Sequence, residues 1–232
     1  MALNTIPADK DADSYITITE ADTYFADFYY GDTVWSAAST ALKENALRMA
    51  TKIIDRFRFF HTKFDNEQRL AHPRYNIETG AGTAESGDTT HLTSSLLADK
   101  QQYPDDYWNY GGVKILQGTN KYEKRQIKDF TRSTGQIETY SAFTSAIDTT
   151  SQFQLIKEVP RDIKHAQAEI ALWIMKGQNR GSRAALQAEG VKSFSVGGLS
   201  ETFESTGKDI AIPQEAQNLL DKYISKIGHY GD

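Results

Sequence analysis

Residues 39–57 read STALKENALRMATKIIDRF, and this stretch gives the clearest structural signal in the chain. Ser39 is a favoured N-cap residue, because its hydroxyl can accept a hydrogen bond from a free amide of the first helical turn. The apolar residues that follow recur at helical spacing, at Leu42, Ala46, Met49, Ala50, Ile53 and Phe57. The pattern predicts an amphipathic helix of about 17 residues, with this apolar stripe turned toward a core.

Further elements are predicted on both sides of this helix. They are a helix from Thr19, as its N-cap, to near Gly31, a helix from Pro160 to Gly177, a β-hairpin over 191–203 and a last helix over 213–227. The hairpin prediction depends on the pair Gly197-Gly198, which stands between two alternating runs as a two-residue turn.

The middle of the chain has a different amino-acid composition. From Asn76 to Gln154, Ser, Thr, Gly and Tyr dominate, and short runs such as Val113-Lys114-Ile115-Leu116 are typical of strands. We therefore predict an inserted β-rich domain at 77–157 and a discontinuous helical core formed by 1–76 and 158–232. The predicted fold class is α+β, mainly a helical bundle core with a C-terminal β-hairpin and an inserted β-rich domain.

The composition excludes several classes of protein. The chain has 26 Lys and Arg against 31 Asp and Glu, which gives a formal net charge of −5. This charge disfavours a protein whose main function is to bind phosphate groups. It has no cysteine, so disulfides, thiolate metal sites and cysteine nucleophiles are excluded. Residues 1–20 show no signal peptide, and no window approaches about 18 apolar residues, so we expect no membrane partner.

No motif for catalysis or metal binding stands out. The five histidines lack metal-ligand spacing, and Asp105-Asp106 favours a solvated turn over a cation site. We therefore predict no catalytic residue, no metal, no cofactor and a role other than that of an enzyme. One alternative stays open, which is an enzyme whose site is assembled from Asp105, Asp106 and His91.

A basic cluster near the middle of the chain is a candidate nucleic-acid or partner surface. Its members are Lys121, Lys124, Arg125, Lys128 and Arg132. Tyr122 and Phe130 lie among them, and basic residues interleaved with aromatic ones are typical of single-strand binding. Glu123 and Asp129 interrupt the cluster, so a solvated strand is the alternative and favoured interpretation.

A similar pattern occurs at Arg56-Phe57-Arg58-Phe59-Phe60, after the helix described first. Large aromatic side chains at the end of an amphipathic helix commonly complete its core. We therefore expect these rings to fill the core rather than to stack on bases.

Five segments of the chain occur in the same order in one known protein family. They are 12–25 (ADSYITITEADTYF), 46–55 (ALRMATKIID), 70–74 (LAHPR), 159–171 (VPRDIKHAQAEIA) and 191–203 (VKSFSVGGLSETF). In these segments the chain resembles the head–tail connector, or head-completion adaptor, proteins of tailed bacteriophages, some of which are labelled primosomal single-stranded-DNA-binding proteins. His72 departs from the usual Trp of that family, and the long insertion replaces a short family loop.

The resemblance implies a structural virion protein, a head-to-tail adaptor that forms a dodecameric ring under the portal in the phage neck and serves genome packaging. The implied partners are the portal protein, the next neck or tail-completion protein, identical subunits, and double-stranded DNA that passes through the lumen without sequence-specific binding. Such a protein is made in the host cytoplasm and located in the virion neck. The family's second label implies the alternative, a single-stranded-DNA-binding replication accessory protein.

The resemblance also implies a contact surface at the C-terminus, because such adaptors use C-terminal segments to contact the portal. The expected portal or subunit contacts are Ile210, Ile212, Leu219, Leu220, Tyr223, Ile224 and Ile227. The other interpretation, that this helix packs on its own bundle, also stays open.

Overall fold

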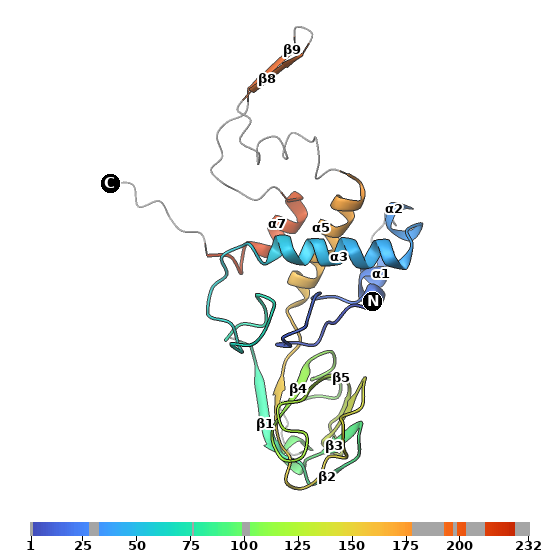
Figure 1. Cartoon of the computed structure of the whole chain (residues 1–232), viewed down its shortest axis with the longest axis vertical. Coiled ribbons are helices and arrows are strands. Elements are labelled where there is room, and N and C mark those ends of the chain that lie inside the picture. The colour runs from blue at the N-terminus through green and yellow to red at the C-terminus, as the bar shows by residue number, and fades with distance from the viewer. Residues whose placement is uncertain are drawn as a thin grey trace, which may run out of the picture. The chain divides into compact units, whose positions relative to one another are not determined.

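The computed structural model describes residues 2–27, 33–75, 77–98, 103–177, 193–196, 199–202 and 212–225 (Figure 1). The chain forms two compact units. Unit 1 comprises residues 1–3, 14–60 and 161–232, and unit 2 comprises residues 4–13 and 61–160. Residues 4–13 and 61–76 therefore group with the strands of the middle of the chain.

Unit 2 is built on a seven-stranded antiparallel sheet in the order β1-β7-β4-β5-β6-β3-β2. The strands are β1 (Thr79–Thr83), β2 (Ser86–Gly87), β3 (His91–Thr93), β4 (Gly112–Gln117), β5 (Lys124–Thr131), β6 (Gln136–Thr139) and β7 (Gln152–Ile156). A short helix, α4 (Ser95–Ala98), follows β3. β-Branched and aromatic residues, such as those of β4, β5 and β7, favour strands.

The two edge strands of this sheet are joined by only two residues. Ala84 and Glu85 connect β1 to β2, so the Cα atoms of Thr83 and Ser86 lie at most about 11 Å apart. The Ala84 amide donates to the Ser151 carbonyl (2.9 Å), and the Glu85 amide donates to the Thr93 carbonyl (2.8 Å). Since opposite edges meet at this link, the sheet curves round on itself.

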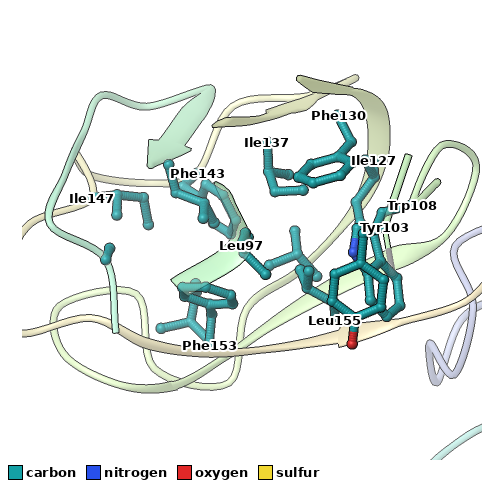
Figure 2. Packing of buried hydrophobic residues seen from close by; sticks show 14 residues of the cluster. Leu97, Tyr103, Trp108, Ile127, Phe130, Ile137, Phe143, Ile147, Phe153 and Leu155 are labelled. Atoms are coloured by element: carbon teal, nitrogen blue, oxygen red, sulfur yellow. The ribbon is translucent and has the colours of Figure 1, made fainter. Parts of the chain in front are cut away.

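The curved sheet encloses a hydrophobic core. β5 turns the corner, because its first part pairs with β4 and its second part with β6, with a register shift between Ile127 and Asp129. A Cβ atom at Gly82 of β1 would lie 2.9 Å from the Phe153 ring, so this strand needs small residues. Figure 2 shows the enclosed cluster, which comprises Ala84, Leu92, Leu97, Tyr103, Trp108, Val113, Ile115, Ile127, Phe130, Ile137, Phe143, Ile147, Phe153 and Leu155.

Asp65 ties the segment before β1 to the sheet. Its carboxylate lies 2.7 Å from the Lys114 ammonium on β4 and 3.0 Å from the Lys124 ammonium on β5. The Lys124 ammonium also donates to the Ala8 carbonyl (2.6 Å). Burial of Asp65 opposes its ionisation, yet hydrogen bonds from Lys114, the Glu67 amide and Lys124 lower its pKa to about 2.

Unit 1 holds the longer helices, arranged around one of them. The elements are α1 (Ile18–Asp27), α2 (Thr33–Ser36), α3 (Thr40–Ile54), α5 (Arg161–Met175), α7 (Gln214–Leu220) and the antiparallel pair β8 (Ser193–Val196) and β9 (Leu199–Thr202). α5 contacts α1, α2, α3 and α7. Gly197 and Gly198, predicted as the hairpin turn, lie outside the described residues.

A buried amide on α5 connects three parts of unit 1. The side-chain nitrogen of Gln167 donates to the Ser14 and Thr51 hydroxyls, at 2.8 Å each. The same nitrogen lies 3.0 Å from the Leu47 carbonyl of α3, and the Gln167 side-chain oxygen accepts a hydrogen bond from the Tyr15 amide (2.9 Å). Gln167 is completely buried, so these contacts satisfy a polar group that would otherwise destabilise the core.

The first residue of α3 agrees with the prediction from the sequence, whereas that of α1 differs from it. Ser39 caps α3 and accepts a hydrogen bond from the Leu42 amide, as predicted. α1 begins earlier than predicted, since Thr17 and Glu20 form its capping box: the Thr17 amide donates to the Glu20 carboxylate (2.9 Å), and the Glu20 amide to the Thr17 hydroxyl (3.1 Å).

The predicted fold class, an α+β chain built mainly on a helical bundle adaptor core, is wrong. The dominant element of the described chain is the seven-stranded antiparallel sheet, and the helices are few and short. The physical reason lies in side-chain size: most of the largest fully buried side chains belong to unit 2, whereas the helices bury many alanines.

No helix in the described ranges is long and apolar enough to cross a membrane.

We expect Asp65→Asn to lower the free energy of unfolding at pH 7 by about 3 kcal/mol, because it leaves two partly buried lysines without their counter-ion. The pKa of Asp65 is lower in the folded chain than its ordinary value of 3.8, so its stabilisation is complete above about pH 4 and is lost as the pH falls through about 2. Urea titrations across this range should show the difference between the two proteins shrinking. Asp11→Asn, in an exposed pair with Lys10, is the matched control and should change nothing. A difference that does not depend on pH would contradict the assignment.

We expect Gln167→Leu to lower the free energy of unfolding by about 3 kcal/mol, because the Tyr15 amide and two hydroxyl groups lose a partner inside the core. The midpoint of urea denaturation measures this change. Gln214→Leu, at an exposed position of α7, should shift the stability by less than about 0.5 kcal/mol. Equal effects of the two substitutions would show that the buried network is not a stabilising element.

Candidate functional site

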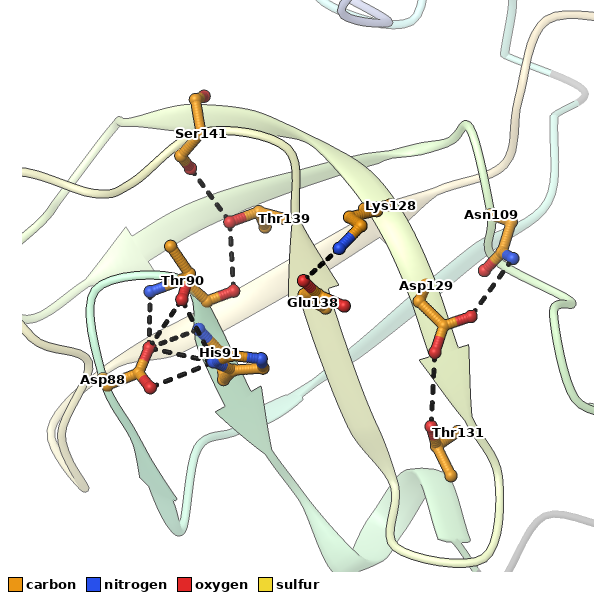
Figure 3. A network of polar contacts seen from close by, with 10 residues as sticks. All are labelled: Asp88, Thr90, His91, Asn109, Lys128, Asp129, Thr131, Glu138, Thr139 and Ser141. Atoms are coloured by element: carbon orange, nitrogen blue, oxygen red, sulfur yellow. Dashed lines mark hydrogen bonds and ion pairs between the residues drawn. The ribbon is translucent and has the colours of Figure 1, made fainter.

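The predicted basic cluster lies on or beside β5, and most of its charge is neutralised locally. Three members form ion pairs: Lys124 with Asp65 (3.0 Å), Arg125 with Glu123 (2.6 Å) and Lys128 with Glu138 (2.5 Å; Figure 3). The Lys121 ammonium lies 4.7 Å from the centroid of the Tyr122 ring. The amide of Arg132 donates to the Asp105 carboxylate (2.8 Å). β5 therefore does not offer a row of unneutralised cations for a phosphate backbone.

The three residues of the enzyme alternative belong to separate hydrogen-bond networks. His91 lies with its ring nitrogen 3.0 Å from the Asp88 carboxylate (Figure 3). Asp105 accepts from the Arg132 amide, and Asp106 accepts from the Asn109 side chain (3.0 Å). Within the described ranges, no group of three His, Asp or Glu residues could hold a metal ion.

The C-terminal residues predicted as portal or subunit contacts fall into four groups. Ile210 and Ile227 lie outside the described residues, and Ile212 and Leu219 are partly exposed. Leu220 is completely buried, in a helix that contacts α5 of the same unit. Tyr223 and Ile224 come after the end of α7, where the chain pairs with residues 58–60. Contact with a portal or with another subunit stays a prediction.

α3 packs on a different face from the one that the apolar stripe predicted. Its buried residues are Ala46, Leu47, Ala50, Thr51 and Ile54. Leu42 and Met49, predicted to be buried, are 50% and 44% exposed. Lys52 is exposed on the face that carries Met49, three residues further along the helix. Arg56 follows in the turn after the helix and is exposed as well.

Beyond α3 the chain alternates between the core and the surface. Phe59 is 6% exposed, whereas Phe60 is 48% exposed, and Arg58 is exposed on the other side of Phe59. Neighbouring side chains of an extended segment point to opposite faces, so Arg58 and Phe60 share the outer one. Lys52, Arg56, Arg58 and Phe60 are all exposed within nine residues of the chain, and we call this group the basic–aromatic strip.

Backbone hydrogen bonds hold this extended segment in place. The Phe60 amide donates to the Tyr223 carbonyl (3.0 Å), and the Ser225 amide donates to the Arg58 carbonyl (2.7 Å). Phe59 and Ile224 are opposite each other in the resulting antiparallel bridge. The outward direction of Phe60 is therefore fixed by pairing with a segment far away in the sequence.

The strip carries three cations that have no carboxylate partner among the described residues. In the part of the chain that the structure describes, neither Lys52, Arg56 nor Arg58 forms an ion pair. The neighbouring acid, Asp55, accepts a hydrogen bond from the Tyr15 hydroxyl. The strip thus combines unneutralised positive charge with an exposed ring, which are the two components of a surface for single-stranded nucleic acid.

The prediction that all three rings of residues 57–60 fill the core is right for Phe59 and wrong for Phe60. A signal was present, because Arg56-Phe57-Arg58-Phe59 alternates with a period of two and so predicts an extended segment with one outer face. Two consecutive phenylalanines cannot then both point inward.

Comparison with known proteins gives one match. Residues 1–87 match the family described as "Putative DnaT-like ssDNA binding protein". No curated protein matches the chain. The matched residues include the whole basic–aromatic strip and stop before β3, so they exclude the β5 cluster.

This match corrects the prediction of a virion structural protein with a head–tail connector role, because it points instead to a family named for single-stranded DNA binding. It agrees with the second label of the resembled family, over residues 1–87. The portal and neck partners, the ring of identical subunits and the virion location stay untested predictions.

Proposed function

We propose that this chain binds single-stranded DNA through the basic–aromatic strip, as a non-enzymatic accessory protein. The observation that carries the proposal is the position of the strip: Lys52, Arg56, Arg58 and Phe60 all lie inside the residues that match a family named for single-stranded DNA binding. The family name does not say which part of the chain would contact DNA. These four side chains are exposed, so they are the candidate contact surface.

The chemistry of the strip suits a single strand better than a duplex. Cationic side chains attract phosphates of either form, but an exposed ring can stack only on a base that is free of its partner. Stacking on an aromatic ring is worth about 1–3 kcal/mol per base and is tolerant of sequence. The proposed ligand is therefore single-stranded DNA without a preferred base sequence.

The overall charge sets the expected strength of binding. A chain with a net charge of −5 repels a polyanion at long range, so attraction comes from the local strip. With at most three cations in the strip, the logarithm of the binding constant should fall with the logarithm of salt concentration with a slope of about −2.

The test is fluorescence anisotropy of a labelled oligothymidylate at several salt concentrations. Arg58→Gln should weaken binding and make the salt slope shallower by about 0.7, because one phosphate contact is lost. Phe60→Leu should weaken binding by about 1–3 kcal/mol and leave the slope unchanged, because a stacking contact carries no charge. The two substitutions thus have different signatures.

Lys128→Gln is the matched control for the loss of a charge, since Lys128 is exposed but paired with Glu138. It should leave both the affinity and the salt slope unchanged. Circular-dichroism melting curves should show that all three variants stay folded. A wild-type chain that does not bind the oligonucleotide, or equal losses in Arg58→Gln and Lys128→Gln, would contradict the proposal.

A further inference from the structure

The C-terminal segment that follows α7 pairs with the strip through its backbone. In this antiparallel bridge Phe59 faces Ile224, with hydrogen bonds on both sides, from the Phe60 amide to Tyr223 and from the Ser225 amide to Arg58. The register therefore places Phe60 opposite Tyr223. This segment lies outside residues 1–87, so the family match says nothing about it.

The pleat of the paired segments decides which way the side chains point. Phe59 is buried, so its cross-strand partner Ile224 shares the inner side, and the residues next to each of them lie on the outer side. Phe60 and Tyr223 are thus cross-strand neighbours on the outer side, and directly opposite side chains in such pairs have Cβ atoms about 4.5–5.5 Å apart. Tyr223 is partly exposed, and Phe60 is 48% exposed.

Lys222 lies next to this pair and contacts the Tyr223 ring. Its ammonium lies 5.2 Å from the centroid of the Tyr223 ring, and its side chain is 63% exposed. An ion pair with Asp162, at the start of α5, anchors it. The contact with the ammonium restricts the partly exposed Tyr223 ring to one orientation, which lowers the entropy cost of stacking for a ligand.

We infer that Tyr223 is a second stacking residue of the proposed interface, and that Phe60 and Tyr223 together form a platform for two adjacent unpaired bases. This inference rests on the proposed function and deepens it. A platform of two rings requires at least two consecutive unstacked nucleotides, which a duplex does not offer. The C-terminal segment therefore completes a surface that residues 52–60 begin.

The test uses three substitutions in the full chain and the same anisotropy assay. Tyr223→Leu should weaken binding of the oligothymidylate by about 5- to 150-fold without a change in salt slope, because it removes a ring and no charge. Tyr223→Phe keeps the ring and should bind within about twofold of the wild type. Tyr140→Leu removes another exposed tyrosine, 54% exposed on unit 2, and should have no effect.

The outcomes separate this inference from the proposed function. If the wild type binds and Phe60→Leu weakens binding, while Tyr223→Leu does not, the platform is wrong and the proposed function stands. If the wild type does not bind the oligonucleotide, both are overturned. A loss in Tyr223→Phe equal to that in Tyr223→Leu would assign the effect to the hydroxyl and would overturn the stacking role.

A second measurement covers the case in which Tyr223→Leu disturbs folding, as a changed melting curve would show. Ultraviolet crosslinking of the wild-type chain to an oligonucleotide that contains 5-iodouracil, followed by peptide mapping, identifies the rings that contact bases. Crosslinks at both Phe60 and Tyr223 are expected. Crosslinks at Phe60 without any at Tyr223 would overturn the inference.

Discussion

The link between the edge strands of unit 2 is the constraint on which its architecture depends. Since Ala84 and Glu85 are all that separates β1 from β2, a seven-stranded sheet with these strands at opposite edges can exist only if it curves until the edges meet. This curvature creates an interior that large side chains fill. Gly82 belongs to the same constraint, because the strand that closes the sheet passes directly over the Phe153 ring.

The proposed surface of unit 1 depends on which face of α3 is buried. The helix turns small residues such as Ala46 and Ala50 toward the core, and this close packing leaves Met49 and Lys52 outside. Small side chains allow a close approach of helices, as around α5, where the Gln167 amide reaches across to α3. The exposed face of α3 then leads into the extended segment that carries the remaining residues of the strip.

Local patterns predicted much of the secondary structure and little of the site. The Ser39 cap and the strand-like composition between Asn76 and Gln154 are local signals, and both correspond to observed structure. The partners of the β5 cations could not be predicted, because Asp65 reaches Lys124 only through the tertiary fold. The same holds for the pairing of residues 58–60 with the C-terminal segment. The apolar stripe of α3 misled, because the buried face includes the polar Thr51, whose hydroxyl accepts a hydrogen bond from Gln167, whereas the apolar Met49 lies outside it.

The two basic regions of the chain differ in what surrounds them rather than in their number of cations. Charges separated by more than about 8–10 Å are largely screened at physiological salt, so a bound phosphate responds to its immediate neighbours and hardly to the net charge. On β5 those neighbours include carboxylates that already hold Lys124, Arg125 and Lys128. Beside the strip residues in sequence, the Asp55 carboxylate accepts a hydrogen bond from the Tyr15 hydroxyl. An acidic chain can therefore still attract a nucleic-acid strand at a place where its cations are not paired with carboxylates.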